Sequence, residues 1–421
     1  MIAVCAVLVL LGAAPLATGA PPAGAAVPAT PSEPRQEPAP APRQEPPPAS
    51  GWLHWPPGPL EEEPQRGFFP VVGSVASGGG LALGGGYRDY ALFGGPVGFE
   101  ASALLSVRGY QSYRVHLGLL APHRDTLDLR PADQPVASML DNRRHPRRGV
   151  AVYLDAGYRS LPRSRFYGIG PGSRPEDRTD YLLRVAALDL AVQGQLTPRL
   201  ELSARAGVLD LATGHGRDDD FPSTGERFTP AQVPGLASAP RYVVAGVGAA
   251  FDTRDGLDAR GGAVFLSGVA WRFHDTSARH LHFTRLAFDG RTYLDVPAVP
   301  GLLALRTVVA TDLAGDAGVP FFLQNSLGGG DLLRAFGSNR WQDRALAHAT
   351  LEWRVALHPA VEIAPFVDAG TVGRGLRRLG EPKACAGVGL RARWGTLALG
   401  RVDWARGSEG SRVVFDLGAV F

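Results

Sequence analysis

The sequence predicts an all-β protein in which residues 68–421 form a transmembrane antiparallel β-barrel of about sixteen strands with a C-terminal closing strand. Three observations support this prediction. Segments of about ten residues alternate between apolar and polar side chains. Tight turns alternate with long polar loops along the chain, and full charges stand in the middle of the polar faces.

The alternation is clear in residues 345–357, ALAHATLEWRVAL, where apolar side chains fill one face and Glu352 and Arg354 lie on the other. Residues 200–208 and 383–394 repeat this pattern. A tilted strand needs roughly 9–11 residues to cross a bilayer. A dry sandwich core would not tolerate unpaired charges at mid-strand. The pattern therefore favours a membrane barrel over a soluble β-sandwich.

The connections between the predicted strands are of two kinds. Short turns lie near Pro359 and at 297–301, whereas long polar loops occupy 213–240 and 314–345. Short periplasmic turns and longer outer loops are typical of outer-membrane barrels. Residues 121–148 are too long for a periplasmic turn, which leaves the strand count open by one strand pair at that point.

The last ten residues, RVVFDLGAVF, place Phe415, Leu417 and Phe421 on one face, and the final residue is aromatic. Such an ending is typical of the terminal-strand signal by which outer-membrane barrels are recognised for insertion. A final strand that merely closes the sheet would alternate in the same way.

The N-terminal region lacks the strand pattern. Residues 2–14 are a short apolar run, so residues 1–25 are expected to be a signal peptide rather than a membrane-spanning helix. Residues 26–67 are rich in proline and are expected to be a disordered linker. Cys385 is then the single cysteine of the mature chain, which excludes an internal disulfide.

The formal net charge of the 421 residues is +3, and Lys383 is the only lysine. Codon bias is one explanation for the preference for arginine. A buried ion network or a lipid-headgroup surface would favour arginine as well, because its guanidinium forks onto carboxylates and phosphates. No basic stripe with interleaved aromatics predicts nucleic-acid binding. The expected partner is outer-membrane lipid, including lipopolysaccharide or an equivalent, and no cofactor or metal is expected.

Residues 329–345, GGDLLRAFGSNRWQDRA, precede one of the clearest strands. They resemble a late loop of the bacterial surface-antigen/barrel-assembly (BamA/TamA-like) superfamily, whose Arg-Gly-aromatic tip folds back into the barrel lumen. Arg334 and Phe336 match the arginine and the aromatic residue. Residues 364–370, APFVDAG, resemble the family's aromatic-x-Asp-x-Gly strand motif through Phe366, Asp368 and Gly370.

The resemblance also places a lumen-facing acid at Glu352. Residues 165–173 and 251–262 resemble further segments of these barrels. It implies an outer-membrane barrel of a diderm bacterium that acts in membrane biogenesis or in protein or lipid translocation. Ala335 departs from the pattern, because it stands where the family has glycine. The β/α repeats that receive clients are also missing, which suggests a periplasmic receiving protein in trans.

Alternation directs Glu352 and Asp368 toward the lumen, and an arginine folded into that space needs carboxylate partners. We therefore expect Asp368 to clamp Arg334, with Glu352 nearby, and so to latch the loop inside. In the alternative, Arg334 is solvated, and the acids pair with other arginines. These are Arg306, Arg354 and Arg391.

Other functions are less well supported by the sequence. The glycines of 328–337 lack the lysine and the following helix of a phosphate-binding loop. An outer-membrane phospholipase would need a serine beside His280 or His282, and no serine stands in a matching context. Asp218 to Asp220 could bind a hard cation but are equally typical of a solvated loop. A passive or gated solute pore remains the main alternative, and the hydrolase is the second.

Overall fold

The computed structural model describes residues 66–119 and 150–417, apart from short gaps at 77, 96, 237, 255–260, 278–280, 297–299, 316–317 and 395–396. The predicted signal peptide, nearly all of the predicted linker and residues 121–148 lie outside this description. His280 and Phe421 do so too. The predictions made for these residues stay predictions.

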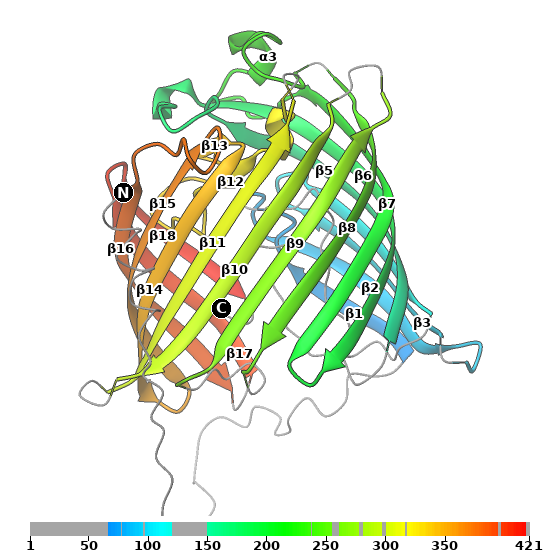
Figure 1. Cartoon of the computed structure of the whole chain (residues 1–421), viewed down its shortest axis with the longest axis vertical. Helices are drawn as coiled ribbons and strands as arrows, with labels where there is room; N and C mark the ends of the chain where they lie inside the picture. The colour runs from blue at the N-terminus through cyan, green and yellow to red at the C-terminus, as the bar shows by residue number, and fades with distance from the viewer. Residues whose placement is uncertain are drawn as a thin grey trace, which may run out of the picture. The chain divides into compact units, whose positions relative to one another are not determined.

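Within the described residues, sixteen strands form one antiparallel sheet that curls into a barrel wall (Figure 1). Each strand pairs with its neighbours in the chain, and β11 pairs with β14. This confirms the prediction of an all-β antiparallel barrel, and β4 pairs directly with β5 across the uncertain segment. The strands of the sheet are β1 (Arg66–Gly73), β2 (Ala82–Leu92), β3 (Val97–Ser106), β4 (Gln111–Gly118), β5 (Val150–Phe166), β6 (Thr179–Thr197), β7 (Leu200–His215), β8 (Arg241–Asp252), β9 (Val264–Asp275), β10 (Phe283–Asp295), β11 (Leu302–Ala314), β14 (Ala345–His358), β15 (Val361–Gly373), β16 (Lys383–Trp394), β17 (Leu397–Gly407) and β18 (Gly410–Leu417).

The remaining elements are short and lie in the connections. A second, two-stranded sheet pairs β12 (Asn325–Leu327) with β13 (Trp341–Asp343). The helices are α3 (Thr224–Arg227), η2 (Pro175–Asp177) and η3 (Phe321–Leu323). Among the described residues, no helix has the length and apolar character needed to cross a membrane.

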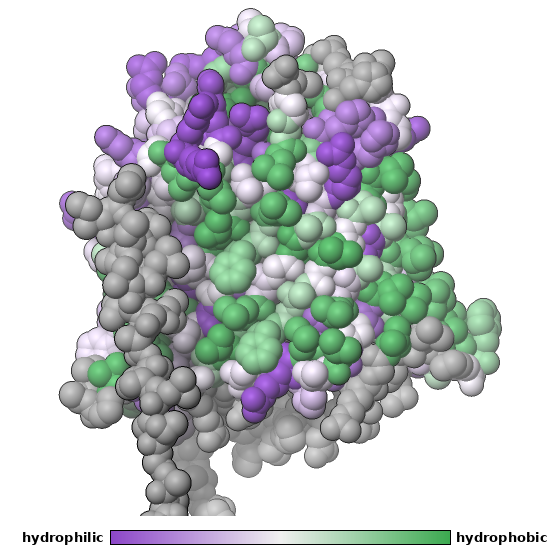
Figure 2. Space-filling view, in the orientation of Figure 1, coloured by the Kyte–Doolittle hydropathy of each residue, from purple (hydrophilic) through white to green (hydrophobic). Residues whose placement is uncertain are grey.

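Apolar side chains of the sheet point outward and charged ones inward. On β7, Leu202 and Val208 are 46% and 47% exposed, whereas Glu201 and Arg205 are 6% and 4% exposed. A water-soluble protein has the opposite arrangement, because burying charge in place of apolar surface is unfavourable. On the face seen in Figure 2, hydrophobic residues cover much of the barrel body and hydrophilic ones gather mainly at one end. The outer surface therefore suits lipid, and the inner wall is polar.

The strands β5, β6 and β7 have 17, 19 and 16 residues, which is longer than the expected ten or so. Their ends at the loop-bearing rim pack against residues of the long connections. The ring of Phe321 lies 4.9 Å from that of Phe166 on β5 and 4.8 Å from that of Tyr181 on β6. Val233 of the 216–240 connection joins the same buried cluster. This apolar cluster supports strand pairing beyond the length needed to cross the bilayer and orders the chain that leads to β12.

Candidate functional site

The loop between β11 and β14 enters and leaves the barrel through a stem. The stem is the β12–β13 ladder, in which Asn325 pairs with Asp343 and Leu327 with Trp341. Gly170, in the β5–β6 connection, donates its backbone N–H to the carbonyl of Gln342 at 2.7 Å. Residues 328–343 are here called the lumen loop. They include β13, so backbone pairing fixes the C-terminal end of the loop.

Two glycines turn the lumen loop back on itself. Gly328 and Gly329 have φ values of +110° and +97°, a region that favours glycine. A Cβ atom on Gly328 would lie 2.2 Å from the carbonyl oxygen of Gly337. Ala335, in contrast, is absent from the described residues with positive φ. The tip therefore turns at the glycine pair, and the alanine occupies an ordinary backbone conformation.

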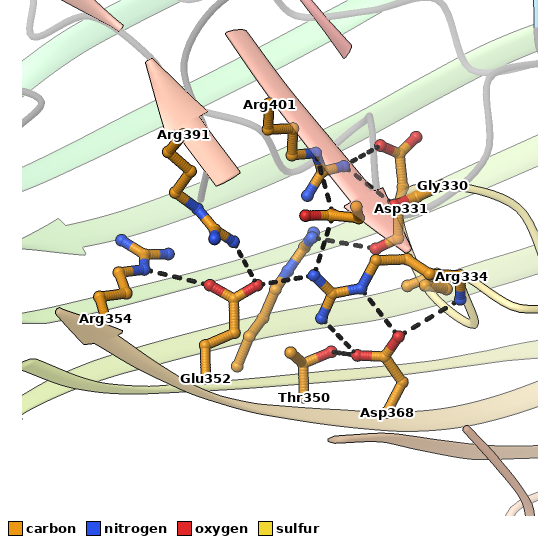
Figure 3. Close-up of polar contacts among 12 residues, drawn as sticks. Gly330, Asp331, Arg334, Thr350, Glu352, Arg354, Asp368, Arg391 and Arg401 are labelled. Atoms are coloured by element: carbon orange, nitrogen blue, oxygen red, sulfur yellow. Dashed lines mark hydrogen bonds and ion pairs between the residues drawn. The ribbon is translucent and has the colours of Figure 1, made fainter. Parts of the chain in front are cut away.

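Arg334 is surrounded by three carboxylates (Figure 3). Its Nε and Nη2 donate to the two oxygens of Asp368 at 2.9 and 2.7 Å. Its Nη1 donates to Glu352 Oε1 at 2.8 Å and to Asp403 Oδ2 at 3.1 Å. The guanidinium carbon lies 3.2 Å from the ring centroid of Phe366. The acids stand on β14, β15 and β17, so one side chain joins three strands.

The site is dry and strongly charged. The Arg334 side chain is 2% exposed, and those of Glu352, Asp368 and Asp403 are fully buried. Burial disfavours the charged guanidinium, but the hydrogen bonds and charges of the carboxylates outweigh it and hold the pKa of Arg334 above its ordinary value. Removing one partner from such a site leaves a buried charge uncompensated.

The acids are shared with a second group of arginines. Glu352 also accepts from Arg391 Nη2 at 2.7 Å and from Arg354 Nε at 3.1 Å. Glu352 thus binds Arg334 and two wall arginines together, but Arg334 is buried and not solvated as in the alternative interpretation. Arg306 does not join this group and pairs with Asp289 at 2.8 Å.

The uncharged side of the lumen loop packs on glycines of the wall. Phe336 is 1% exposed and makes an edge contact with Trp341 at 4.9 Å. A Cβ atom on Gly407 would lie 2.7 Å from the Phe336 ring, and one on Gly370 would lie 2.9 Å from Leu327. Gly407 therefore permits the loop to approach β17 closely, and Gly370 permits the stem to approach β15.

Sequence reasoning missed three residues of this site: Asp403, Arg401 and Arg340. The first two alternate with outward-facing Val402 and Trp404, so the period-two pattern contained the signal for them. Arg401 Nη2 donates to the carbonyl of Gly330 at 2.9 Å. Arg340 lies within the loop itself, and no alternation marks it.

The residues considered for other activities have structural contacts. The ring of His282 stacks on that of His274 at 4.5 Å and accepts the backbone N–H of Asp275. Asp218 pairs with Arg178 at 3.1 Å, which uses the carboxylate proposed for a cation.

Phe415, of the predicted terminal-strand signal, is 74% exposed on β18. Leu417 ends that strand, and its side chain lies outside the description.

An antiparallel barrel with an apolar outer surface and a polar interior is the architecture of outer-membrane barrels. Residues 244–421 match the Omp85 superfamily domain, a range that contains Arg334 and all three of its carboxylate partners. This match lies in the C-terminal part of the barrel, and together with the fold it indicates a barrel of the Gram-negative outer membrane.

Two solved structures show the same fold. BamA from Haemophilus ducreyi lacking POTRA domains 1–3 matches with a TM-score of 0.59 and 13% identity over 86% of this chain and 71% of that chain. CdiB from Escherichia coli matches with a TM-score of 0.51 and 15% identity over 86% of this chain. This chain spans 64% of that CdiB, which is less than two thirds. A search of curated proteins found no match.

Proposed function

We propose that this barrel acts in outer-membrane biogenesis or in protein or lipid translocation, through a lumen gated by residues 328–343. The observation that carries the proposal is the clamp on Arg334, in which buried carboxylates from three strands hold one loop residue. The desolvation of these charges costs several kcal/mol per ion, and this cost supports a specific role for the position of the loop.

The clamp supports a gate with two states. The hydrogen bonds of Arg334 are charge-assisted and directional, so the loop either occupies this geometry or loses several contacts together. Thr350 also donates to Asp368, at 2.9 Å, and fixes the carboxylate that receives the guanidinium fork. A substrate that enters the lumen would have to displace the loop as a unit.

We further propose two kinds of partner. The apolar outer surface suits outer-membrane lipid, including lipopolysaccharide or an equivalent. A periplasmic receiving protein in trans would supply the client-binding repeats that the resemblance implies. Copurification from crosslinked cells tests the second partner. Loss of the crosslinked species on substitution of periplasmic turn residues would locate its contact.

A solute pore is the second candidate, and the charged inner wall favours it. Asp289 binds both Arg291 and Arg306, at 2.8 Å each, on the lumen-facing side of β10 and β11. Charged side chains that line a pore tune ion passage in channels. In this role the loop would control solutes rather than clients.

Replacement of the gene copy by Arg334→Ala tests the main proposal. We expect surface assembly of outer-membrane proteins or lipid to fall while the barrel is still inserted. Arg241→Ala, which removes an exposed pair with Asp210, is the matched control. Normal assembly in a strain that lacks the whole chain, together with altered solute uptake, would reject biogenesis and support the pore.

A further inference from the structure

Arg340 is a second buried arginine of the lumen loop, with a side chain that is 3% exposed. Its Nε lies 2.9 Å from both carboxylate oxygens of Glu409. Its Nη1 donates to the hydroxyl of Ser173 at 3.1 Å, and its Nη2 donates to the carbonyl of Ser173 at 2.9 Å. One guanidinium therefore connects the loop with two other segments of the chain.

These two segments belong to distant parts of the sheet. Glu409 lies in the tight turn of the last hairpin, where Gly407 of β17 pairs with Gly410 of β18. Ser173 lies in the connection between β5 and β6. Because a two-residue turn moves with its strands, any displacement of the last hairpin acts directly on the Glu409 carboxylate.

Further contacts of the loop involve the same two segments. Arg412 on β18 donates to the carbonyl of Phe336, close to the tip. Tyr167 lies under the guanidinium of Arg340 at 5.0 Å, and Trp341 at 4.6 Å. The loop thus bridges the β5–β6 connection and the last hairpin, and Arg340 touches both sides.

The two arginine sites differ in exposure. The carboxylates around Arg334 are fully buried, whereas the Glu409 side chain is 26% exposed. Water can replace the bonds of a partly exposed carboxylate more easily than those of a buried one. The Arg340 contact is therefore the easier of the two to open.

We propose that Arg340 is a positioning residue that ties the part of the lumen loop around it to the β17–β18 hairpin, so that movement of this hairpin releases this part before Arg334 leaves its carboxylates. This deepens the proposed gating and rests on it. The loop opens in two steps, and the first step depends on the position of the last hairpin.

Accessibility of Ser338, which is 8% exposed, tests the proposal. The full chain is placed in lipid vesicles with Ser338→Cys in a Cys5→Ser, Cys385→Ser background, and labelling by a membrane-impermeant maleimide is timed. Arg340→Gln and Glu409→Gln should each raise the labelling rate about tenfold, because each removes charge-assisted hydrogen bonds that keep the loop closed. Arg340→Lys should give an intermediate rate, since it keeps the charge but loses the fork.

Arg174→Gln is the control, because Arg174 lies in the same β5–β6 connection and pairs only locally with Glu176 and Asp177 among the described ion pairs. Its labelling rate should equal that of the parent. Rates for Arg340→Gln and Glu409→Gln that match this control would overturn the proposal. If Arg340→Gln fails to fold, Glu409→Gln decides alone. The labelling assay contains no client, so it tests the Arg340 contact separately from the proposed function. If the labelling rate rises but the same variants show no export defect in cells, the Arg340 contact is supported and the proposed function is rejected.

Discussion

Arg334 and Asp368 form a forked, fully desolvated ion pair in which the loop residue also donates its backbone N–H to the same carboxylate, at 3.3 Å. The pair joins the tip of a connection to the middle of β15. Backbone and side chain of one residue thus bind one acid, which fixes both the position and the direction of the loop at this point.

Asp368→Asn should lower the free energy of unfolding by about 3–5 kcal/mol, because it leaves the buried Arg334 charge without its main partner. Urea unfolding in lipid vesicles measures this loss. Asp210→Asn, which breaks an exposed pair of 2.7 Å with Arg241, is the matched control and should cost about 1 kcal/mol or less. Equal losses in the two variants would show that burial of the Arg334 site contributes nothing.

Gly328→Ala should destabilise the closed loop by about 1–3 kcal/mol, since the alanine must adopt a positive φ. Its Cβ would also meet the Gly337 carbonyl at 2.2 Å. Gly172→Ala is the control, because no atom lies within 4 Å of its Cβ position and its φ is unremarkable. Protease cleavage of the loop in the folded barrel checks the prediction, which fails if both variants resist equally.

Ala335→Gly restores the residue that the family has beside the arginine, yet it should not stabilise this protein. The described backbone turns at Gly328 and Gly329 and leaves Ala335 without a positive φ. A glycine there would add flexibility to the unfolded chain and cost about 0.5–1 kcal/mol. A higher urea midpoint for this variant would contradict the account of the turn.

The sequence predicted the barrel well because lipid imposes a simple rule on strands: apolar out, polar in. The rule marks Glu352 and Asp368 as inward-facing, and it marks Asp403 and Arg401 equally. The expectation of strands of about ten residues was too short for β5 to β7, because their outer ends pack against connections that are distant in sequence. Periodicity within one strand contains no information about such packing.

The contacts of the lumen loop depended on a resemblance, because loop residues follow no period. Arg334 was singled out in this way, and the structure places it against Asp368 and Glu352. Arg340 has no counterpart in the quoted motif, and its partners Ser173 and Glu409 lie 167 and 69 residues away in the chain. Only the folded barrel brings these three residues together.

The most direct test of the central claim is single-channel conductance of the purified protein in planar bilayers. The account predicts a wild-type barrel that is mostly closed, and a long-lived open state on Arg334→Ala or on deletion of residues 328–343. Folding of each purified variant is verified by circular dichroism before it is added to the bilayer. A wide channel that is stably open in the wild type and unchanged by the deletion would contradict the latched loop and support a simple pore.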